Sequence, residues 1–187
     1  FEGIQLVLPT TVFEDRHVLN LDGTEVHLIY VGPCHQTGDT LIHVPSEGVV
    51  FTGDVIFHEC TPMGWNGSYE KWMKNLDFII SLKPKVIVPG HGPVCGVEGV
   101  VQMKAYLEYV RGEAMRCFGL GMSALDASKK IDFGPYAEWR APARIFMNVE
   151  RAYREFRNEA GDAPWDHAKT FDAIYHVAKA RGLHLEF

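Results

Sequence analysis

Short runs in which apolar and polar residues alternate fill the first third of the chain. Runs of this kind, bounded by glycine, proline or aspartate, are typical of β-strands. They predict strands at residues 4–8, 17–21, 25–31, 40–44 and 49–52. The Asp22-Gly23 pair between the second and third runs predicts a tight hairpin, because this dipeptide favours the positive φ angles that such a turn requires.

The apolar period changes to that of a helix after residue 67. Trp72, Leu76 and Ile79 recur on one helical face, with Ser68 placed to cap the helix and Pro84 placed to end it. A further buried strand is predicted at residues 86–88. Helical patterns then follow at residues 97–118, 124–131, 144–159 and 166–181.

Strands followed by helices, with one β-α-β unit between them, predict an α/β layered fold. We expect two parts, an α/β domain at residues 1–118 and a helical C-terminal extension at residues 119–187 that packs on it. Within the extension, the arginines at positions 151, 154 and 157 are predicted to form a solvated face or a row of ion pairs with Glu150 and Glu155.

Three segments place a histidine or aspartate just past an apolar strand and beside a glycine. They read Gly-Pro-Cys-His35-Gln-Thr-Gly-Asp39, Phe-Thr-Gly-Asp54 and Pro-Gly-His91-Gly-Pro. Any one of them alone is more often a turn or a hydrogen-bonded surface residue than a ligand. If the strands share a sheet and end at one edge, two imidazoles and a carboxylate converge there, which is a donor set for zinc or a similar divalent metal.

In this order, the three segments resemble the later motifs of the metallo-β-lactamase superfamily over about residues 20–95. The resemblance implies an αββα sandwich, of which the chain holds a part, and a metal site at His35, Asp54 and His91. By resemblance, His35 completes the histidine set of the first metal, Asp54 bridges two metals, and His91 binds the second. Zinc is the expected metal, with two divalent ions in the complete site; iron and manganese are the alternatives.

The first signature of that family, His-x-His-x-Asp-His, does not occur in these 187 residues. We therefore expect a truncated chain, whose other metal ligands come from an N-terminal segment or from a partner chain. Without the strands around that signature, the sheet would expose a large apolar face, which soluble monomers rarely tolerate. The stretch is therefore expected to need a covering partner for stable folding, and homo-oligomerisation is left open.

The resemblance implies a metal-dependent hydrolase similar to glyoxalase II. A metal-bound hydroxide, oriented by Asp54, would attack an ester, thioester, lactone or related carbonyl of a small-molecule substrate. A phosphoryl centre is the lesser alternative. The hypothesis from another class is a non-catalytic subunit or interaction module that retains a degenerate metal site.

Composition narrows the list of partners. The formal net charge of −6 disfavours a nucleic-acid backbone as the main partner. No apolar run is long enough for a membrane helix. The four cysteines have no CxxC spacing, so free thiols in a reducing compartment, the cytoplasm, are expected.

Side chains near the motifs are assigned supporting roles. Asp39 is predicted to buttress its loop by hydrogen bonds, and Cys34 to be a small apolar filler. Met63 and Trp65 either line a substrate entrance or simply pack. His58 is expected to be structural, with a place at the pocket mouth as the alternative.

Overall fold

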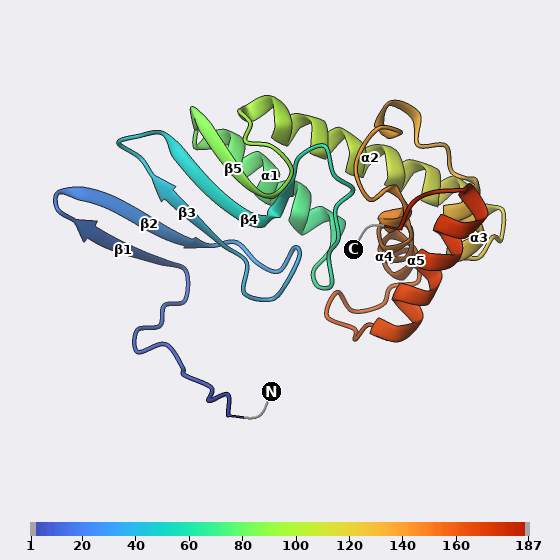
Figure 1. Ribbon diagram of the computed structural model, residues 1–187, viewed down its shortest axis with the longest axis horizontal. Helices are drawn as coiled ribbons and strands as arrows, with labels where there is room; N and C mark the ends of the chain where they lie inside the picture. Colours follow the sequence, from blue (N-terminus) through green and yellow to red (C-terminus); the bar gives the residue numbers. More distant parts are fainter. Residues whose placement is uncertain (1–2, 186–187) are drawn as a thin grey trace.

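The computed structural model describes residues 3–185, which form one sheet and a set of helices (Figure 1). The strands and helices are β1 (Arg16–Leu21), β2 (Thr24–Tyr30), β3 (Thr40–Val44), β4 (Val49–Phe57), α1 (Tyr69–Ser81), β5 (Val86–His91), α2 (Val97–Gly119), α3 (Ala124–Lys130), η1 (Gly134–Tyr136), η2 (Pro142–Arg144), α4 (Ile145–Phe156) and α5 (His167–Arg181). The mixed α/β class is the one that the sequence predicts.

The sheet has the strand order β1-β2-β3-β4-β5. The first four strands pair antiparallel, and β5 joins β4 in parallel through the crossover helix α1. The hairpin predicted at Asp22-Gly23 is confirmed, because both residues have positive φ, 51° and 89°, between β1 and β2. The parallel pair brings the carboxyl ends of β4 and β5 to one edge of the sheet.

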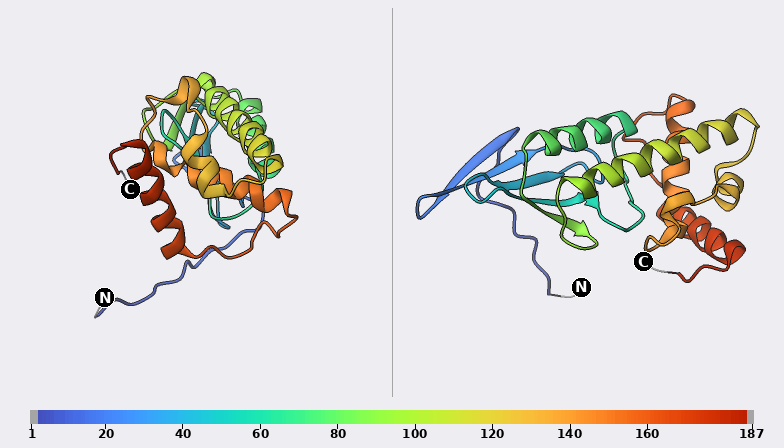
Figure 2. Two further views of the ribbon diagram at one scale, coloured as in Figure 1. Left: turned by 90° about the vertical axis from the view of Figure 1, so that its right-hand side faces the viewer. Right: turned by 90° about the horizontal axis from the view of Figure 1, so that it is seen from above.

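Helices α1 and α2 run side by side along one face of the sheet (Figure 2). Trp72, Leu76 and Ile79 of α1 are fully buried, as predicted, and the Trp72 indole Nε1–H donates to the Val55 carbonyl at 2.8 Å. Ser68 caps α1 by accepting a hydrogen bond from the Lys71 amide at 3.1 Å. The core therefore lies between this sheet face and the two helices.

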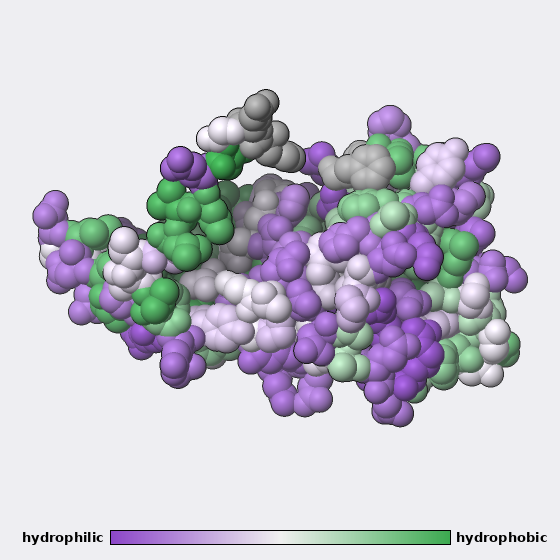
Figure 3. Space-filling model, turned by 90° about the horizontal axis from the view of Figure 1, so that it is seen from below, coloured by the Kyte–Doolittle hydropathy of each residue, from purple (hydrophilic) through white to green (hydrophobic). Residues whose placement is uncertain are grey.

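The other face of the sheet is open. Phe51 of β4 and its cross-strand neighbour Ile42 of β3 point to this side and are 43% and 39% exposed. Val50, the residue before Phe51 in β4, points to the helices and is fully buried. Figure 3 shows hydrophobic side chains gathered around the strands and the N-terminal segment. The structure thus has one helix layer and one sheet layer, half of the implied sandwich.

The strand predicted at residues 4–8 is wrong. These residues form no strand, and the side chain of Leu6 is 87% exposed. An extended segment becomes a strand only when a neighbour accepts and donates its backbone hydrogen bonds. In residues 3–185, no strand runs beside this segment. Its apolar residues therefore face solvent.

The strands predicted at residues 49–52 and 86–88 continue further than their apolar runs. β4 extends to Phe57, with register shifts on both sides of Gly53 where the pairing with β5 is irregular. β5 extends to His91. Two of the metal-ligand candidates therefore lie within strands rather than in the loops after them.

Helices α3, α4 and α5 gather at the end of the molecule away from the β1–β2 hairpin, and α2 reaches them from the sheet (Figures 1 and 2). The predicted row of ion pairs is confirmed for Arg154 and Arg157, which lie 3.4 and 2.8 Å from the Glu150 carboxylate. It is wrong for Arg151, which is 4% exposed. On a helix of 3.6 residues per turn, this residue falls on the same face as the buried Met147 and Asn148.

The division of the chain at residues 118 and 119 stays a prediction.

None of the helices within residues 3–185 combines the length and the apolarity that crossing a membrane demands.

Neighbouring valines in β4 test whether the outer sheet face is open in solution. We expect Val50→Thr to lower the free energy of unfolding by about 1–3 kcal/mol, because it buries a hydroxyl against the helices. The matched variant Val49→Thr, on the open face, should change it by only about 0.5 kcal/mol. Urea unfolding measures both. Equal losses would mean that the outer face is covered.

Candidate metal site at the sheet edge

The three predicted ligands come together at the carboxyl edge of β4 and β5. His35 lies in the loop between β2 and β3, Asp54 in the irregular part of β4, and His91 at the end of β5. His35 Nε2 is 3.3 Å from Asp54 Oδ2, and His91 Nε2 is 3.6 Å from Asp54 Oδ1. Each imidazole therefore faces a different oxygen of one carboxylate.

A hydrogen bond determines which nitrogen of His35 can bind a metal. His35 Nδ1 lies 2.8 Å from the Met63 carbonyl oxygen. Because a carbonyl oxygen can only accept, Nδ1 carries the proton in this contact. Nε2 of the neutral ring then keeps its lone pair, and this lone pair is on the side of Asp54. Metal-binding histidines commonly have this arrangement.

The spacing of these atoms fits co-ligation of a metal. Ligands about 2.0–2.1 Å from a tetrahedral zinc lie about 3.3 Å from one another. The two imidazole–carboxylate distances, 3.3 and 3.6 Å, are close to that spacing. A neutral Nε2 lone pair and a carboxylate oxygen repel each other unless a cation or a proton lies between them. The donor set of this chain therefore fits a divalent metal.

These residues do not form a complete metal site. In the part of the chain that the structure describes, no group of three or more His, Cys, Asp or Glu side chains is arranged so that it could hold a metal ion. The cluster instead consists of two pairs that share Asp54. Such pairs suit a bridging carboxylate with one imidazole on each ion, and each ion would need further donors.

The close approach of β4 and β5 depends on a glycine. A Cβ atom at position 90 would collide with Asp54 Oδ1 and with the Gly53 backbone. Only glycine therefore allows the carboxylate to lie against β5 beside His91. The glycine next to each predicted ligand was part of the sequence motif, and here its role is steric.

Phe57 is a supporting residue that the sequence reasoning missed. Its ring stacks on the His91 imidazole, with centroids 4.7 Å apart and planes at 7°, and it lies 6.0 Å from the His35 ring. It is fully buried, and its backbone amide contacts the Met103 sulfur at 3.2 Å. In the sequence it appears only as the last residue of the apolar Val-Ile-Phe run after Asp54, which indicates burial but no contact with His91.

His58 has the structural role expected of it. Its backbone amide donates to the His91 carbonyl at 2.9 Å, and its Nδ1 lies 3.0 Å from the Pro93 carbonyl. Phe57 and His58 therefore fix His91 from the strand that also carries Asp54.

The buttressing role predicted for Asp39 is confirmed. Its carboxylate accepts hydrogen bonds from the backbone amides of Cys34, His35 and Gln36, at 2.8, 2.7 and 3.1 Å. Cys34 is fully buried, and burial raises the pKa of its thiol to about 11. A thiol with this pKa stays protonated near neutral pH and is a poor metal ligand. The interpretation of Cys34 as a filler agrees with this.

The loop that carries Met63 and Trp65 is tied to His35 through its backbone. The Trp65 amide donates to the His35 carbonyl at 2.7 Å, in addition to the Met63 contact. The Trp65 ring stacks on His167 of α5, with centroids 4.4 Å apart. Both side chains are partly buried against the core, so both residues take part in packing, the second of the two alternatives. That they also line a substrate entrance stays a prediction.

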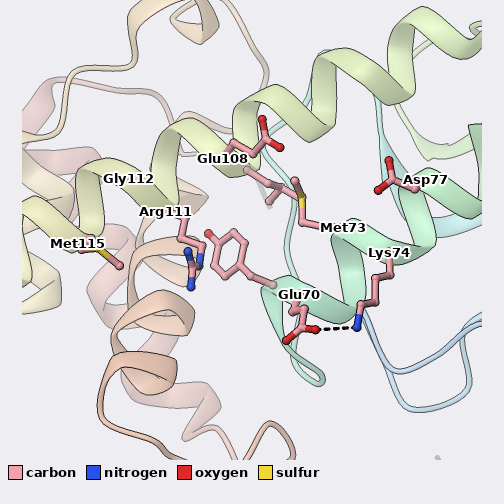
Figure 4. Close-up of a pocket in the computed structure, with 10 residues that line it drawn as sticks. Glu70, Met73, Lys74, Asp77, Glu108, Arg111, Gly112 and Met115 are labelled. Carbon is pink, nitrogen blue, oxygen red and sulfur yellow. Dashed lines mark hydrogen bonds and ion pairs between the residues drawn. The ribbon is translucent and has the colours of Figure 1, made fainter.

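A separate hollow of about 490 Å³ lies between α1 and α2 (Figure 4). Its rim carries charges of both signs, and several are already in ion pairs, such as Lys74 with Glu70 at 2.6 Å and Arg111 with Glu155 at 3.6 Å. None of the three metal-ligand candidates lines it. It is therefore not part of the site at the sheet edge.

Comparison with known proteins points to one family. The profile of the Metallo-beta-lactamase superfamily matches residues 3–91. The chain is 31% identical over 91 residues, 46% of its length, to 2,4-dinitroanisole O-demethylase subunit alpha of Nocardioides sp. (strain JS1661). It is 29% identical over 104 residues, 53% of its length, to Metallo-beta-lactamase type 2 of Bacteroides fragilis. The matches span 27% and 42% of these relatives, so the chain corresponds to less than half of either.

Solved structures share the fold. The sec-alkylsulfatase Pisa1 from Pseudomonas sp. superposes with a TM-score of 0.61 at 16% identity, covering 81% of this chain and 27% of its own. A metallo-β-lactamase family protein from Thermus thermophilus gives a TM-score of 0.56 at 18% identity, covering 82% of this chain and 50% of its own. These likenesses concern the fold alone.

Removing the charge of Asp39 tests how the His35 loop is held. We expect Asp39→Asn to lower the free energy of unfolding by about 2 kcal/mol, because an amide cannot accept all the hydrogen bonds that the carboxylate accepts. The exposed Asp15→Asn is the control and should be neutral. Denaturant unfolding measures both. A neutral Asp39→Asn would show that the carboxylate does not hold this loop.

Proposed function

The chain belongs to the metallo-β-lactamase superfamily, and on this premise we propose that it forms part of a metal-dependent hydrolase. The observation that carries the proposal is the Asp54 carboxylate, whose two oxygens face the imidazoles of His35 and His91. In the proposed site, Asp54 would be shared by two divalent ions, with His35 a ligand of one ion and His91 a ligand of the other.

Divalent ions supply the same two effects in many hydrolases. When bound, divalent ions lower the pKa of a coordinated water toward about 7 and polarise a substrate carbonyl. The chain's own residues supply orientation. His35 is held in the Nδ1–H tautomer by the Met63 carbonyl, and His91 is held by its stack on Phe57. Zinc is the metal we propose, and iron or manganese would suit the same donors.

We further propose that the remaining ligands come from another segment or from a partner chain with a His-x-His-x-Asp-His motif. Two features support this. The described side chains do not complete a metal group by themselves. The sheet face that carries Ile42 and Phe51 is open, and an added layer there would bury it.

The substrate we propose is a small molecule with an ester, thioester, lactone or related carbonyl, as in glyoxalase II-like enzymes. The relatives carry names as different as O-demethylase and metallo-β-lactamase, so they support the class of reaction and do not select a substrate. Four buried cysteines without CxxC spacing suit a reducing compartment, and the cytoplasm is the proposed location.

One observation favours a second candidate function. Because no described group can hold a metal alone, the chain would also suit a non-catalytic subunit or interaction module. A module of this kind would fold well without metal.

Metal binding and hydrolysis distinguish the two functions. We expect Zn²⁺ and Co²⁺ to bind the protein when the segment or partner chain that supplies the remaining ligands is present, and Asp54→Ala to weaken binding by more than about 100-fold, since even groups that only orient ligands contribute about 10–100-fold. His35→Ala and His91→Ala should each remove one ion. Plasma emission spectrometry and calorimetry measure these changes, with the exposed His176→Ala as the control.

Aryl esters, thioesters and lactones are then assayed with the metal-loaded protein. Hydrolysis that is lost in Asp54→Ala and kept in His176→Ala would support the enzyme. A well-folded protein that binds neither ion, with that segment or partner chain present, would contradict the hydrolase and favour the module.

The open sheet face gives a further test. In the absence of a covering layer, we expect copies of the chain to associate through this face, and Phe51→Asp to shift the protein to monomers. Phe78→Asp on α1, where the phenylalanine is similarly exposed (37%, against 43% for Phe51), should not do so. Light scattering coupled to size-exclusion chromatography measures the mass. A wild-type monomer at high concentration would contradict the proposal that the face needs cover.

A further inference from the structure

Arg151 of α4 is a buried cation that binds the loop next to His35. Its Nη1 donates to the carbonyl oxygens of Asn66 and Gly67, at 2.7 and 2.9 Å. The guanidinium lies over the Trp72 ring, 5.4 Å from its centroid. Arg151 is therefore one of the side chains by which the helical C-terminal block reaches the metal side of the sheet, together with Asn148, which donates to the Pro62 carbonyl at 3.0 Å, and His167, which stacks on Trp65.

The loop at residues 63–67 is held between Arg151 and the His35 segment. On one side, its carbonyls accept from the guanidinium. On the other side, the Met63 carbonyl accepts from His35 Nδ1 and the Trp65 amide donates to the His35 carbonyl. A Cβ at Gly64 would lie 2.7 Å from Arg151 Nη2 and 2.8 Å from the Cys34 carbonyl, so the two sides meet closely here.

Stability alone does not account for a charge in this position. Desolvation lowers the pKa of Arg151, which means that burial disfavours its charged form. Its Nη2 is buried without a hydrogen-bond partner among the described residues. A buried cation with an unsatisfied N–H group costs free energy, and apolar side chains of similar volume often replace such groups at no loss.

We propose that Arg151 is a positioning residue for His35. It fixes the carbonyls of residues 66 and 67, and thereby the loop that presents the Met63 carbonyl to His35 Nδ1–H. The imidazole then keeps its Nε2 lone pair toward Asp54. This inference rests on the proposed function of the site, because the lone pair is there to bind a metal.

The same helix offers a matched control. Arg157 follows the last residue of α4 and pairs with the carboxylates of Glu150 and Glu159, at 2.8 and 2.5 Å. These partners lie on α4 and just after it, and Glu159 lines a small hollow together with Trp65 and Gly67. Replacing Arg157 by methionine removes an arginine from this end of the helix and leaves in place the hydrogen bonds of the loop to Arg151 and to His35.

The direct test is the tautomer of His35 in the metal-free protein, read by long-range ¹H–¹⁵N NMR. We expect the Nδ1–H form to dominate in the wild type and in Arg157→Met. In Arg151→Met the ratio of the two tautomers should shift toward Nε2–H by about threefold or more, because the carbonyls of residues 66 and 67 lose their donor and the loop is held less firmly. Arg151→Lys should recover part of the wild-type ratio, since an ammonium can still donate to one carbonyl.

A second readout is affinity for Co²⁺ alone. We expect Arg151→Met to weaken it by about 10-fold, at the low end of the effect of groups that orient metal ligands, and Arg157→Met to leave it unchanged. Urea unfolding establishes that each variant is folded, and Arg151→Lys carries the test if the methionine variant is not.

The two proposals fail in different ways. A wild-type protein that binds no metal when the segment or partner chain with the remaining ligands is present overturns the hydrolase, while the tautomer ratio still reports on Arg151. An unchanged tautomer ratio in folded Arg151→Met and Arg151→Lys overturns the positioning role, even if both variants bind Co²⁺.

Discussion

The contact between the Asp54 carboxylate and the imidazoles on either side of it is the constraint on which this structure depends. An imidazole lone pair that faces a carboxylate oxygen is stable there only with a cation or a proton between the two atoms. The backbone meets the geometric demand by an irregular pairing at Gly53 and a glycine at position 90, which let β4 and β5 approach closely at their carboxyl ends. The positive charge that this contact requires would come from the cation that binds there.

The sequence predicts the parts of this arrangement that local patterns encode. The glycine-flanked positions of His35, Asp54 and His91 identify them as candidates, and the structure brings them to one edge. Asp22-Gly23 and Ser68 act as predicted because turns and caps depend on near neighbours. Local patterns were not enough for residues 4–8, where an apolar run predicts a strand and the structure has no neighbour to pair with it.

The residues that the sequence did not reveal act across long separations. Phe57 reads as one more apolar strand position, and nothing in its surroundings indicates a stack on His91. Arg151 sits in a row with Arg154 and Arg157 and looks like them, yet a rotation of 100° per residue turns its side chain inward. A pattern of charges along a helix does not say which of them the tertiary structure buries. Tertiary packing decides which charges are buried. For Arg151, burial follows from contacts with a loop more than eighty residues earlier in the sequence.

The two halves of the site, His91 with Asp54 and His35 with Asp54, consequently depend on different parts of the molecule. The pair of His91 and Asp54 is built within β4, β5 and the turn after them, where Phe57 and His58 are close neighbours in sequence. The pair of His35 and Asp54 needs the loop at residues 63–67, and that loop is anchored on α4. Loosening of the helical block would therefore act first on His35, because the hydrogen bond that sets its tautomer depends on a carbonyl that the block holds in place. The C-terminal helices are in this sense part of the metal side of the fold, although they contribute none of the proposed ligands.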